Sequence, residues 1–373
     1  MRGVDGKALP RLSAADYWVQ TWGVLVAAYR ELNARKLFWV ALALNGLVIA
    51  AMAAVGIDEK GVSVLGFDLS IPRVNATTYP DGRLYKFIFV GLGVGIWLAW
   101  LSTILALLST ASMFPDLASG GVDTMLSKPI GRTRLFVTKF ASGLLFTALQ
   151  VSVFSALAFL VIGIRGGSWE WGIFVVVPLM VVFFSYLFCV QAVVGLVTRS
   201  PIASVIVTLL FWIFVFLVDT GERFTMVGRI ASQLEIEAIE ARLAKVENEE
   251  RKSGFVKLRD EAQEALPNWT LAHGIFFAAK TVLPKTSETA QLTGRVLALA
   301  TEIPVEDEEE TVDEDERRQR GLFTSNFVSE RKLGAAIGKE YESRNPWWIV
   351  GTSLGFVGAT LAFGAWHFRR RDF

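Results

Sequence analysis

The sequence WGIFVVVPLMVVFFSYLFCVQAVVGLVT runs from Trp171 to Thr198 without one Asp, Glu, Lys or Arg. At about 1.5 Å per residue, a helix of this length crosses a hydrocarbon core of about 30 Å. A single charge at the centre of such a helix would cost about 3 kcal/mol. The stretch therefore predicts a transmembrane helix.

Five further blocks of the chain lack charged residues in the same way: Leu37–Ile57, Phe87–Pro115, Phe140–Ile164, Pro201–Val218 and Asn345–Phe368. Hydrophobic residues make up 53% of the 373 residues, and they occur in these long blocks rather than in short periodic stretches. We predict an all-α, polytopic membrane protein with six transmembrane helices. The alternative is five spans and one buried block, which would put one cationic end on the far side of the membrane.

The basic residues of the short loops predict the orientation. With six spans, one side of the membrane receives the following residues: Arg30, Arg35 and Lys36, then Lys128, Arg132, Arg134 and Lys139, then Arg199, and finally Arg369, Arg370 and Arg371. Short loops rich in Lys and Arg stay in the cytoplasm. We expect a multi-pass protein of the bacterial inner membrane with both termini cytoplasmic, and with Lys139 and the three terminal arginines at the lipid headgroups.

The segment before the first span, within residues 1–36, has a helical apolar face. Trp18, Trp22, Leu25, Tyr29 and Leu32 recur at spacings of three and four. Trp and Tyr favour the membrane interface, which predicts that Trp18, Trp22 and Tyr29 anchor an interfacial helix on the lipid. An ordinary surface helix packed on the bundle is the alternative.

Residues 219–344 differ from the rest of the chain because they are rich in charge and in helix formers. We expect an extracytoplasmic insert, partly helical and partly disordered, between spans one to five (37–218) and span six with its basic tail (345–373). Leu271–Val282 is apolar but too short to cross, so it is a candidate to lie on or dip into the outer leaflet. Glu306–Glu316 is an acidic run typical of a solvated loop.

The loop from Met113 to Lys139 is the most informative polar segment. Pro115 is expected to close span two, and the Gly120-Gly121 pair permits a sharp reversal. A short helix, Val122–Ser127, then presents Val122, Met125 and Leu126 on one side, and Pro129 ends it. A short helix with apolar anchors suits a groove in a soluble partner.

This loop resembles the coupling-helix region of permeases of the second exporter class of ABC transporters (the ABC-2-type membrane protein family). Those permeases carry an acidic residue, a glycine and a pattern close to D-x-x-L-S-K-P-I-x-R, followed by a lysine. The matching residues here are Asp116, Gly120, Asp123, Leu126, Ser127, Lys128, Pro129, Ile130, Arg132 and Lys139. The resemblance covers residues 14–218 and 346–373 and departs in the long insert.

The resemblance implies a non-catalytic permease subunit of an exporter, whose cargo moves when a separate ABC ATPase hydrolyses ATP. ATP and Mg²⁺ would bind to that ATPase. The residues that would contact it are Asp116, Gly120, Val122, Asp123, Met125, Leu126, Ser127, Lys128, Pro129 and Arg132. Two permeases, as a homodimer, would assemble with two ATPases.

The sequence excludes several other chemistries. It contains no G-x-x-x-x-G-K-[ST] loop, so we expect no ATP hydrolysis by this chain along that route. Cys189 is the only cysteine, which excludes an intrachain disulfide, a CxxC motif and a cysteine-based metal site. A net charge of +1 gives no bulk attraction to nucleic acid.

Two alternatives remain. A non-transporting scaffold would use residues 219–344 to bind an envelope partner. An intramembrane hydrolase would use Ser353 of the G-x-S-x-G match Gly351–Gly355, although that motif needs a strand-to-helix turn and a histidine base. Uncharged polar residues within the spans are candidates for a substrate path, but helix–helix hydrogen bonds explain them equally well; they are Asn45, Gln150, Ser185, Tyr186 and Gln191.

Overall fold

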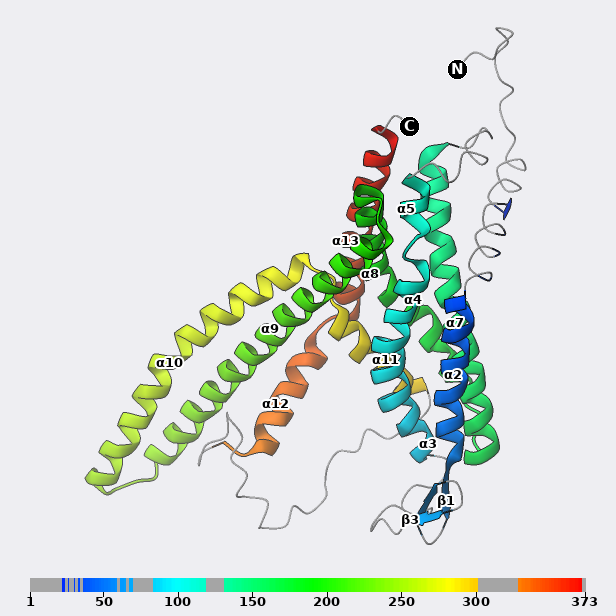
Figure 1. Ribbon diagram of the computed structural model, residues 1–373. Coiled ribbons are helices and arrows are strands. Elements are labelled where there is room, and N and C mark those ends of the chain that lie inside the picture. Colours follow the sequence, from blue (N-terminus) through cyan, green and yellow to red (C-terminus); the bar gives the residue numbers. More distant parts are fainter. Residues whose placement is uncertain are drawn as a thin grey trace, which may run out of the picture. The chain divides into compact units, whose positions relative to one another are not determined.

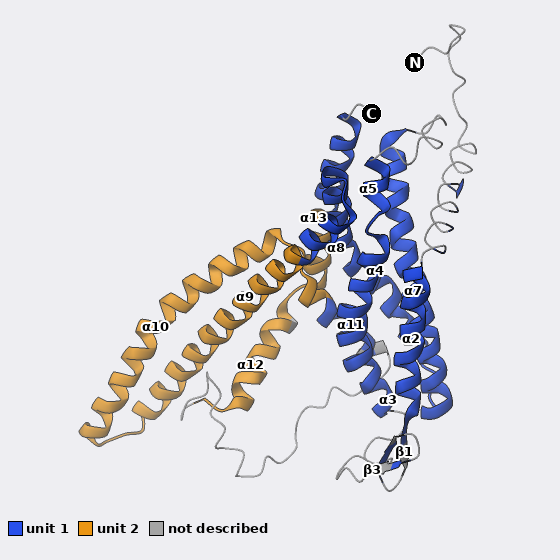
Figure 2. Cartoon of the chain, in the orientation of Figure 1, with its two compact units in different colours: residues 1–209, 290–303, 357–373 blue, residues 210–289, 304–356 orange. Residues whose placement is uncertain are grey.

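The computed structural model describes residues 22, 23, 26, 30, 33, 36–58, 61–64, 67–69, 83–118, 131–300 and 328–370. These residues are almost entirely helical (Figure 1). Within these described ranges, six helical segments are long and apolar enough to cross a membrane, which agrees with the predicted number of spans and indicates a multi-pass membrane protein. The chain divides into two compact units, residues 1–209, 290–303 and 357–373, and residues 210–289 and 304–356 (Figure 2).

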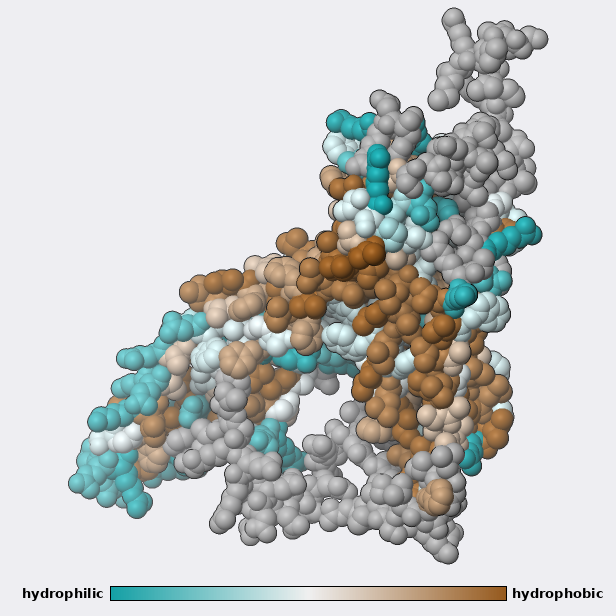
Figure 3. Space-filling model, viewed as in Figure 1, coloured by the Kyte–Doolittle hydropathy of each residue, from teal (hydrophilic) through white to brown (hydrophobic). Residues whose placement is uncertain are grey.

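The membrane helices of the first unit form a packed bundle. Their bounds are α2 Lys36–Ala54, α3 Arg83–Ile88, η1 Phe89–Ser102, α4 Thr103–Thr110, α5 Met113–Ala118, α7 Arg132–Gly166, the 3₁₀ turn η2 Trp171–Val175 and α8 Val176–Thr198. Helix α7 packs against both α2 and α8, and α5 packs against α8. The exposed surface of these helices is strongly apolar, as a lipid environment requires (Figure 3).

Span two is not a uniform α-helix. Its central part, η1, is π-helical, and the α-helical hydrogen bonding resumes in α4. The helix breaks at Ala111 and Ser112, and α5 begins at Met113, so Pro115 does not close the span as predicted. Pro115 lies in the first turn of α5, where a helix tolerates the missing N–H donor.

A small antiparallel sheet follows α2 and was not predicted. Its strands are β1 Val55–Asp58, β2 Gly61–Val64 and β3 Phe67–Leu69, with Val55 opposite Val64 and Val62 opposite Leu69. The Tyr85 hydroxyl donates a 2.7 Å hydrogen bond to the carbonyl of Val55. At the same end of the bundle Lys86 pairs with Glu170 at 2.6 Å, so the ends of spans two and three are tied to neighbouring segments.

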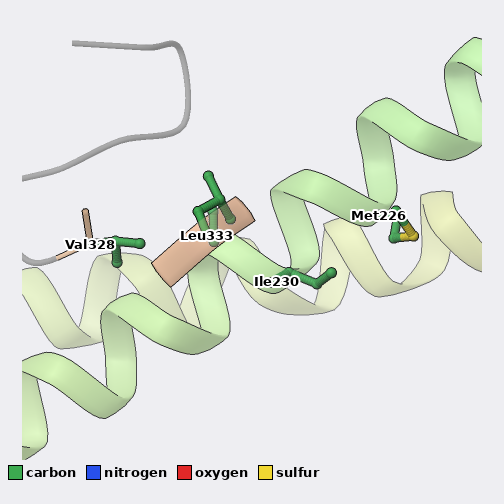
Figure 4. Close-up of a cluster of buried hydrophobic side chains, with 5 residues drawn as sticks. Met226, Ile230, Val328 and Leu333 are labelled. Carbon is green, nitrogen blue, oxygen red and sulfur yellow. The ribbon is translucent and has the colours of Figure 1, made fainter. Parts of the chain in front are cut away.

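The second unit contains most of α9 Pro201–Leu243, all of α10 Glu249–Val282 and α12 Glu330–Ser343, the start of α11 Thr286–Ala300 and the first part of α13 Pro346–Arg370. Helix α9 does not end at Val218, where its charge-free block ends, but continues for a total of 43 residues. Met226, Ile230 and Ala231 of α9 form a buried cluster with Val328 and Leu333, which attaches α12 to α9 (Figure 4).

Several predicted features lie outside the described residues. They include most of the interfacial helix before span one, the acidic run Glu306–Glu316 and the central part of the loop, residues 119–130. Their predictions stand as expectations.

Candidate functional site

The two ends of the loop 119–130 are held by a buried aromatic cluster, which we call the loop mount and define as α5 with Phe136, Phe188 and Gly195. Met113, Phe114, Leu117 and Ala118 of α5 are all buried. The Phe114 ring lies 5.4 Å from Phe136 of α7 and 5.6 Å from Phe188 of α8, measured between ring centroids. Helix α5, before the loop, therefore packs through the Phe114 ring on α7, after the loop, and on α8.

Glycines allow the helices of the loop mount to approach closely. A Cβ added at Gly195 would lie 2.9 Å from Pro115 Cδ and 3.3 Å from Phe114 Cβ, and one at Gly143 would lie 2.3 Å from the Phe188 ring. Distances this short do not occur for real Cβ atoms without movement of a neighbour. The close packing of α5 on α8 thus requires a glycine at position 195.

The far side of Phe136 is covered by the end of α13. The centroids of Phe136 and Phe368 lie 6.5 Å apart, and a Cβ at Gly364 would lie 3.0 Å from both Phe136 Cζ and Val193 Cγ2. Arg199, in the turn between α8 and α9, adopts the left-handed conformation with φ of 54°. Its N–H donates to the Gly195 carbonyl at 3.0 Å, which ends α8 directly after the loop mount.

The structure places some of the predicted site residues and leaves others undescribed. Asp116 is exposed on α5, Arg132 begins α7, and Lys139 is only 4% exposed although headgroup contact was expected. Trp22 is 68% exposed, and the Arg370 guanidinium lies 4.3 Å from the centroid of the Trp366 ring. Arg369 is exposed in the last turn of α13. The other predicted site residues lie outside the described part of the chain: Gly120, Val122, Asp123, Met125, Leu126, Ser127, Lys128, Pro129, Trp18, Tyr29 and Arg371.

The uncharged polar residues of the spans bond to neighbouring helices. Trp97 Nε1 donates to Asn45 Oδ1 at 2.6 Å, and Gln150 Nε2 donates to Ser102 Oγ at 3.0 Å. Gln191 Nε2 donates to the Leu107 carbonyl at 2.7 Å. The interpretation of these residues as helix–helix contacts is therefore confirmed for Asn45, Gln150 and Gln191.

A buried group of charged residues in the second unit was not predicted. We call it the ionic cluster and define it as Asp219, Glu222, Lys280, Glu288 and Arg344. Lys280 Nζ lies 2.9 Å from Glu222 Oε2 and 3.0 Å from Glu288 Oε1, and it also pairs with Asp219. Arg344 bonds to both Glu222 and Glu288. Four separate elements thus meet through charge-assisted hydrogen bonds.

The side chains of the ionic cluster are no more than 9% exposed. Burial alone would lower the pKa of Lys280, but the charges of Asp219, Glu288 and Glu222 raise it above its ordinary value. Burial likewise opposes ionisation of Arg344, whose pKa is raised by its hydrogen bond to Glu222 and by both carboxylates. The cations of the cluster are therefore held in their charged form.

The ionic cluster contains three carboxylates and two strong bases, and one carboxylate oxygen, Glu288 Oε2, is buried without a hydrogen-bond partner. His273 Nδ1 lies 3.8 Å from Glu222, but burial, together with the charge of Arg229, lowers the His273 pKa below its ordinary value. Its imidazole is therefore neutral at pH 7. A further cation, Arg223, lies 3.9 Å from Asp219 Oδ2 and balances the third carboxylate. Among the described residues no group of three or more His, Cys, Asp or Glu side chains could hold a metal ion.

Sequence reasoning missed the ionic cluster because its members are far apart in the chain. Asp219 and Glu222 follow the charge-free block Pro201–Val218 directly, a position typical of residues at the membrane interface, yet Glu222 is fully buried. The spacing of the two carboxylates places them on one face of α9, which was the one local signal. Their partners Lys280 and Arg344 follow Glu222 by 58 and 122 residues, so no short sequence pattern connects them with the carboxylates.

Ser353, the serine of the G-x-S-x-G match, lies inside α13 and is fully buried. Its Oγ donates to the Ile349 carbonyl at 2.8 Å and accepts a 3.0 Å hydrogen bond from the Lys285 backbone N–H. Lys285 Nζ donates to Thr352 Oγ1 at 2.6 Å and lies 4.3 Å from the centroid of the Trp348 ring. Ser353 thus connects α13 to the turn after α10.

In comparisons with known proteins, the chain matches no family model, no curated protein and no solved structure.

Proposed function

We propose that this chain is the membrane-spanning permease subunit of an ATP-driven ABC transporter, with a separate ATPase docked on the loop between spans two and three. The observation that best supports the proposal is the loop mount. Phe114, Phe136 and Phe188 interleave, so the helices before and after the loop, α5 and α7, are packed through these rings on each other and on α8.

The mechanism follows from this packing. Closely packed interiors move as bodies because their side chains have little free space. A partner that displaces the short helix predicted for residues 122–127 would therefore shift α5, α7 and α8 together, as a rigid-body transition. ATP and Mg²⁺ belong to the partner ATPase in this proposal, and the chain itself is not an enzyme.

The proposed assembly is a homodimer of permeases with two ATPases in a bacterial inner membrane. Both termini and the loop lie in the cytoplasm, as the basic residues of the short loops indicate. Export is proposed as the direction of transport because the loop resembles that of the ABC-2-type permeases.

The test replaces Val122, Met125 and Leu126 together by alanine in the full-length protein, which is then purified from its native membranes with a mild detergent. Photolabelling with azido-ATP identifies any nucleotide-binding polypeptide that co-purifies. The matched control replaces Leu145, Leu160 and Ile164 of α7, which are exposed apolar residues away from the loop. The proposal predicts a labelled partner with the wild type and the control but not with the loop variant, and equal recovery from all three would refute docking at this loop.

A scaffold remains the second candidate because of α9. This helix runs 25 residues beyond its charge-free block, to Leu243, and α12 packs on that extension. An extension of this kind suits binding of an envelope protein. The scaffold predicts that no nucleotide-binding polypeptide co-purifies even with the wild type.

A further inference from the structure

One face of α10 changes its chemical character along the helix. Positions that share this exposed face are charged or polar over the first part of α10, at Lys257, Asp260, Glu264 and Asn268. From Leu271 onward the same face is apolar, with Leu271 67% exposed, Ile275 62%, Val282 73%, and Ala278 exposed between them. The change from polar to apolar surface along α10 is visible in Figure 3.

The opposite face of this apolar part carries buried charge. Lys280 is 4% exposed and pairs with carboxylates of α9 and α11, whereas its neighbours Ala278, Ala279 and Val282 are exposed. A helix in water shows the reverse arrangement, with apolar residues inside and lysines outside. Charged residues that face the protein interior and pair with one another, behind an apolar outer face, are typical of membrane surroundings.

The apolar part of α10 lies beside the end of the charge-free block of α9. The two helices are antiparallel: a Cβ at Gly221 would lie 2.5 Å from the Phe276 ring, and one at Gly228 would lie 2.7 Å from the Trp269 ring. The next residues along, Leu283 and Pro284, line one small cavity together with Val215 and Val218 of α9. Val215 and Val218 belong to the uncharged block Pro201–Val218.

The turn after α10 is also bonded to the charge-free part of α13. The Lys285 N–H donates to Ser353 Oγ, and Ser353 follows Asn345, the start of that block, by eight residues. At about 1.5 Å per residue this places the turn about 12 Å along the block. Lys285 is buried, and Thr352, the Thr281 carbonyl and the Trp348 ring provide its contacts.

From these observations we infer that the face formed by Leu271, Ile275, Ala278 and Val282 contacts lipid acyl chains, so that the end of α10 enters the membrane beside α9. The occupant is lipid because the adjoining part of the neighbouring helix α9, within its charge-free block, also exposes large apolar side chains, at Ile213, Phe214 and Leu217. The Leu283–Lys285 turn is then the deepest point of a segment that enters and leaves the bilayer on one side. This inference does not depend on the proposed transport function.

The test uses single cysteines in a full-length Cys189→Ala background, reconstituted in phosphatidylcholine–phosphatidylglycerol vesicles. Spin labels are attached at Leu271→Cys, Ile275→Cys and Val282→Cys, and the matched control is Glu264→Cys on the same face of the same helix. Relaxation by oxygen, which partitions into acyl chains, is compared with relaxation by a water-soluble nickel chelate. We expect the ratio of oxygen to nickel accessibility to rise several-fold from Glu264 to Leu271, Ile275 and Val282, in that order.

Two results would overturn the inference. Equal ratios at Glu264 and Val282 would place the apolar face in water. Low accessibility to both reagents with spin–spin broadening at Ile275 would show a second copy of the chain on the face instead of lipid. If a labelled variant does not assemble, the unmodified protein in the same vesicles is photolabelled with a hydrophobic aryl diazirine; adducts within residues 271–285 support the inference, and their absence alongside labelled spans contradicts it.

Discussion

Lys280 on α10 and Glu222 on α9 form a 2.9 Å ion pair in which the lysine side chain is 5% exposed and the carboxylate is fully buried. Asp219 and Glu288 pair with the same ammonium group. Lys280 thus pairs with carboxylates from two helices. Because Arg344 also pairs with Glu222 and Glu288, the loss of Lys280 removes one of the two buried cations that offset the cost of burying these carboxylates.

Replacing Lys280 by methionine should therefore strongly destabilise the protein. Removing one partner of a buried ion pair costs roughly 3–5 kcal/mol because the remaining charge stays uncompensated. Thermal unfolding in detergent measures the loss. The control is Lys252→Met. Lys252 Nζ lies 3.5 Å from Glu249 Oε1, and the Glu249 side chain is 87% exposed, so we expect the free energy of unfolding to change by less than about 1 kcal/mol. Similar melting temperatures for the two variants would show that the ionic cluster does not hold the helices together.

Gly195→Ala should loosen the loop mount. The new Cβ would lie 2.9 Å from Pro115 Cδ, and overpacking of this kind costs about 1–3 kcal/mol. Gly254→Ala is the control, because a Cβ there meets nothing within 4 Å and alanine is the better helix former. We expect a lower melting temperature for Gly195→Ala and an unchanged or higher one for Gly254→Ala, whereas two equally stable variants would argue against tight seating of α5 on α8.

Ser353→Ala should affect stability and not any hydrolytic activity. The substitution leaves the buried Lys285 N–H without its acceptor, which costs about 1–3 kcal/mol. A fluorophosphonate probe tests the competing hypothesis of a nucleophilic serine, and Thr352→Ala serves as the neighbouring control. Covalent labelling of the wild type that is lost in Ser353→Ala but kept in Thr352→Ala would support the hypothesis of a hydrolase with Ser353 as its nucleophile.

The sequence predicted the six spans because the absence of charge over about 20 residues is a direct physical requirement of the membrane. The predictions from the sequence were wrong where contacts with residues far along the chain determine the local structure. Asp219 suggested the end of span five, yet α9 continues because partners 58 or more residues away neutralise its carboxylates. Pro115 was expected to end span two. Because the helix is interrupted at Ala111 and Ser112, Pro115 instead lies in the first turn of the new helix α5.

Other features had no local signal at all. The π-helical hydrogen bonding of η1 does not follow from a run of apolar residues. The loop mount depends on Gly195 of one span meeting Pro115 of another, which a single sequence does not reveal. The loop itself could be proposed as a site from its residues, but its aromatic attachment to three helices required the structure.

The most direct test of the transporter account is a crosslink from the loop. Val122→Cys and Met125→Cys, each in the Cys189→Ala background, are labelled in intact cells and in inside-out vesicles with a membrane-impermeant maleimide, and then coupled to a cleavable photocrosslinker. The account predicts labelling in inside-out vesicles alone, and a crosslinked partner that also binds azido-ATP. Labelling of these cysteines from outside intact cells would contradict it.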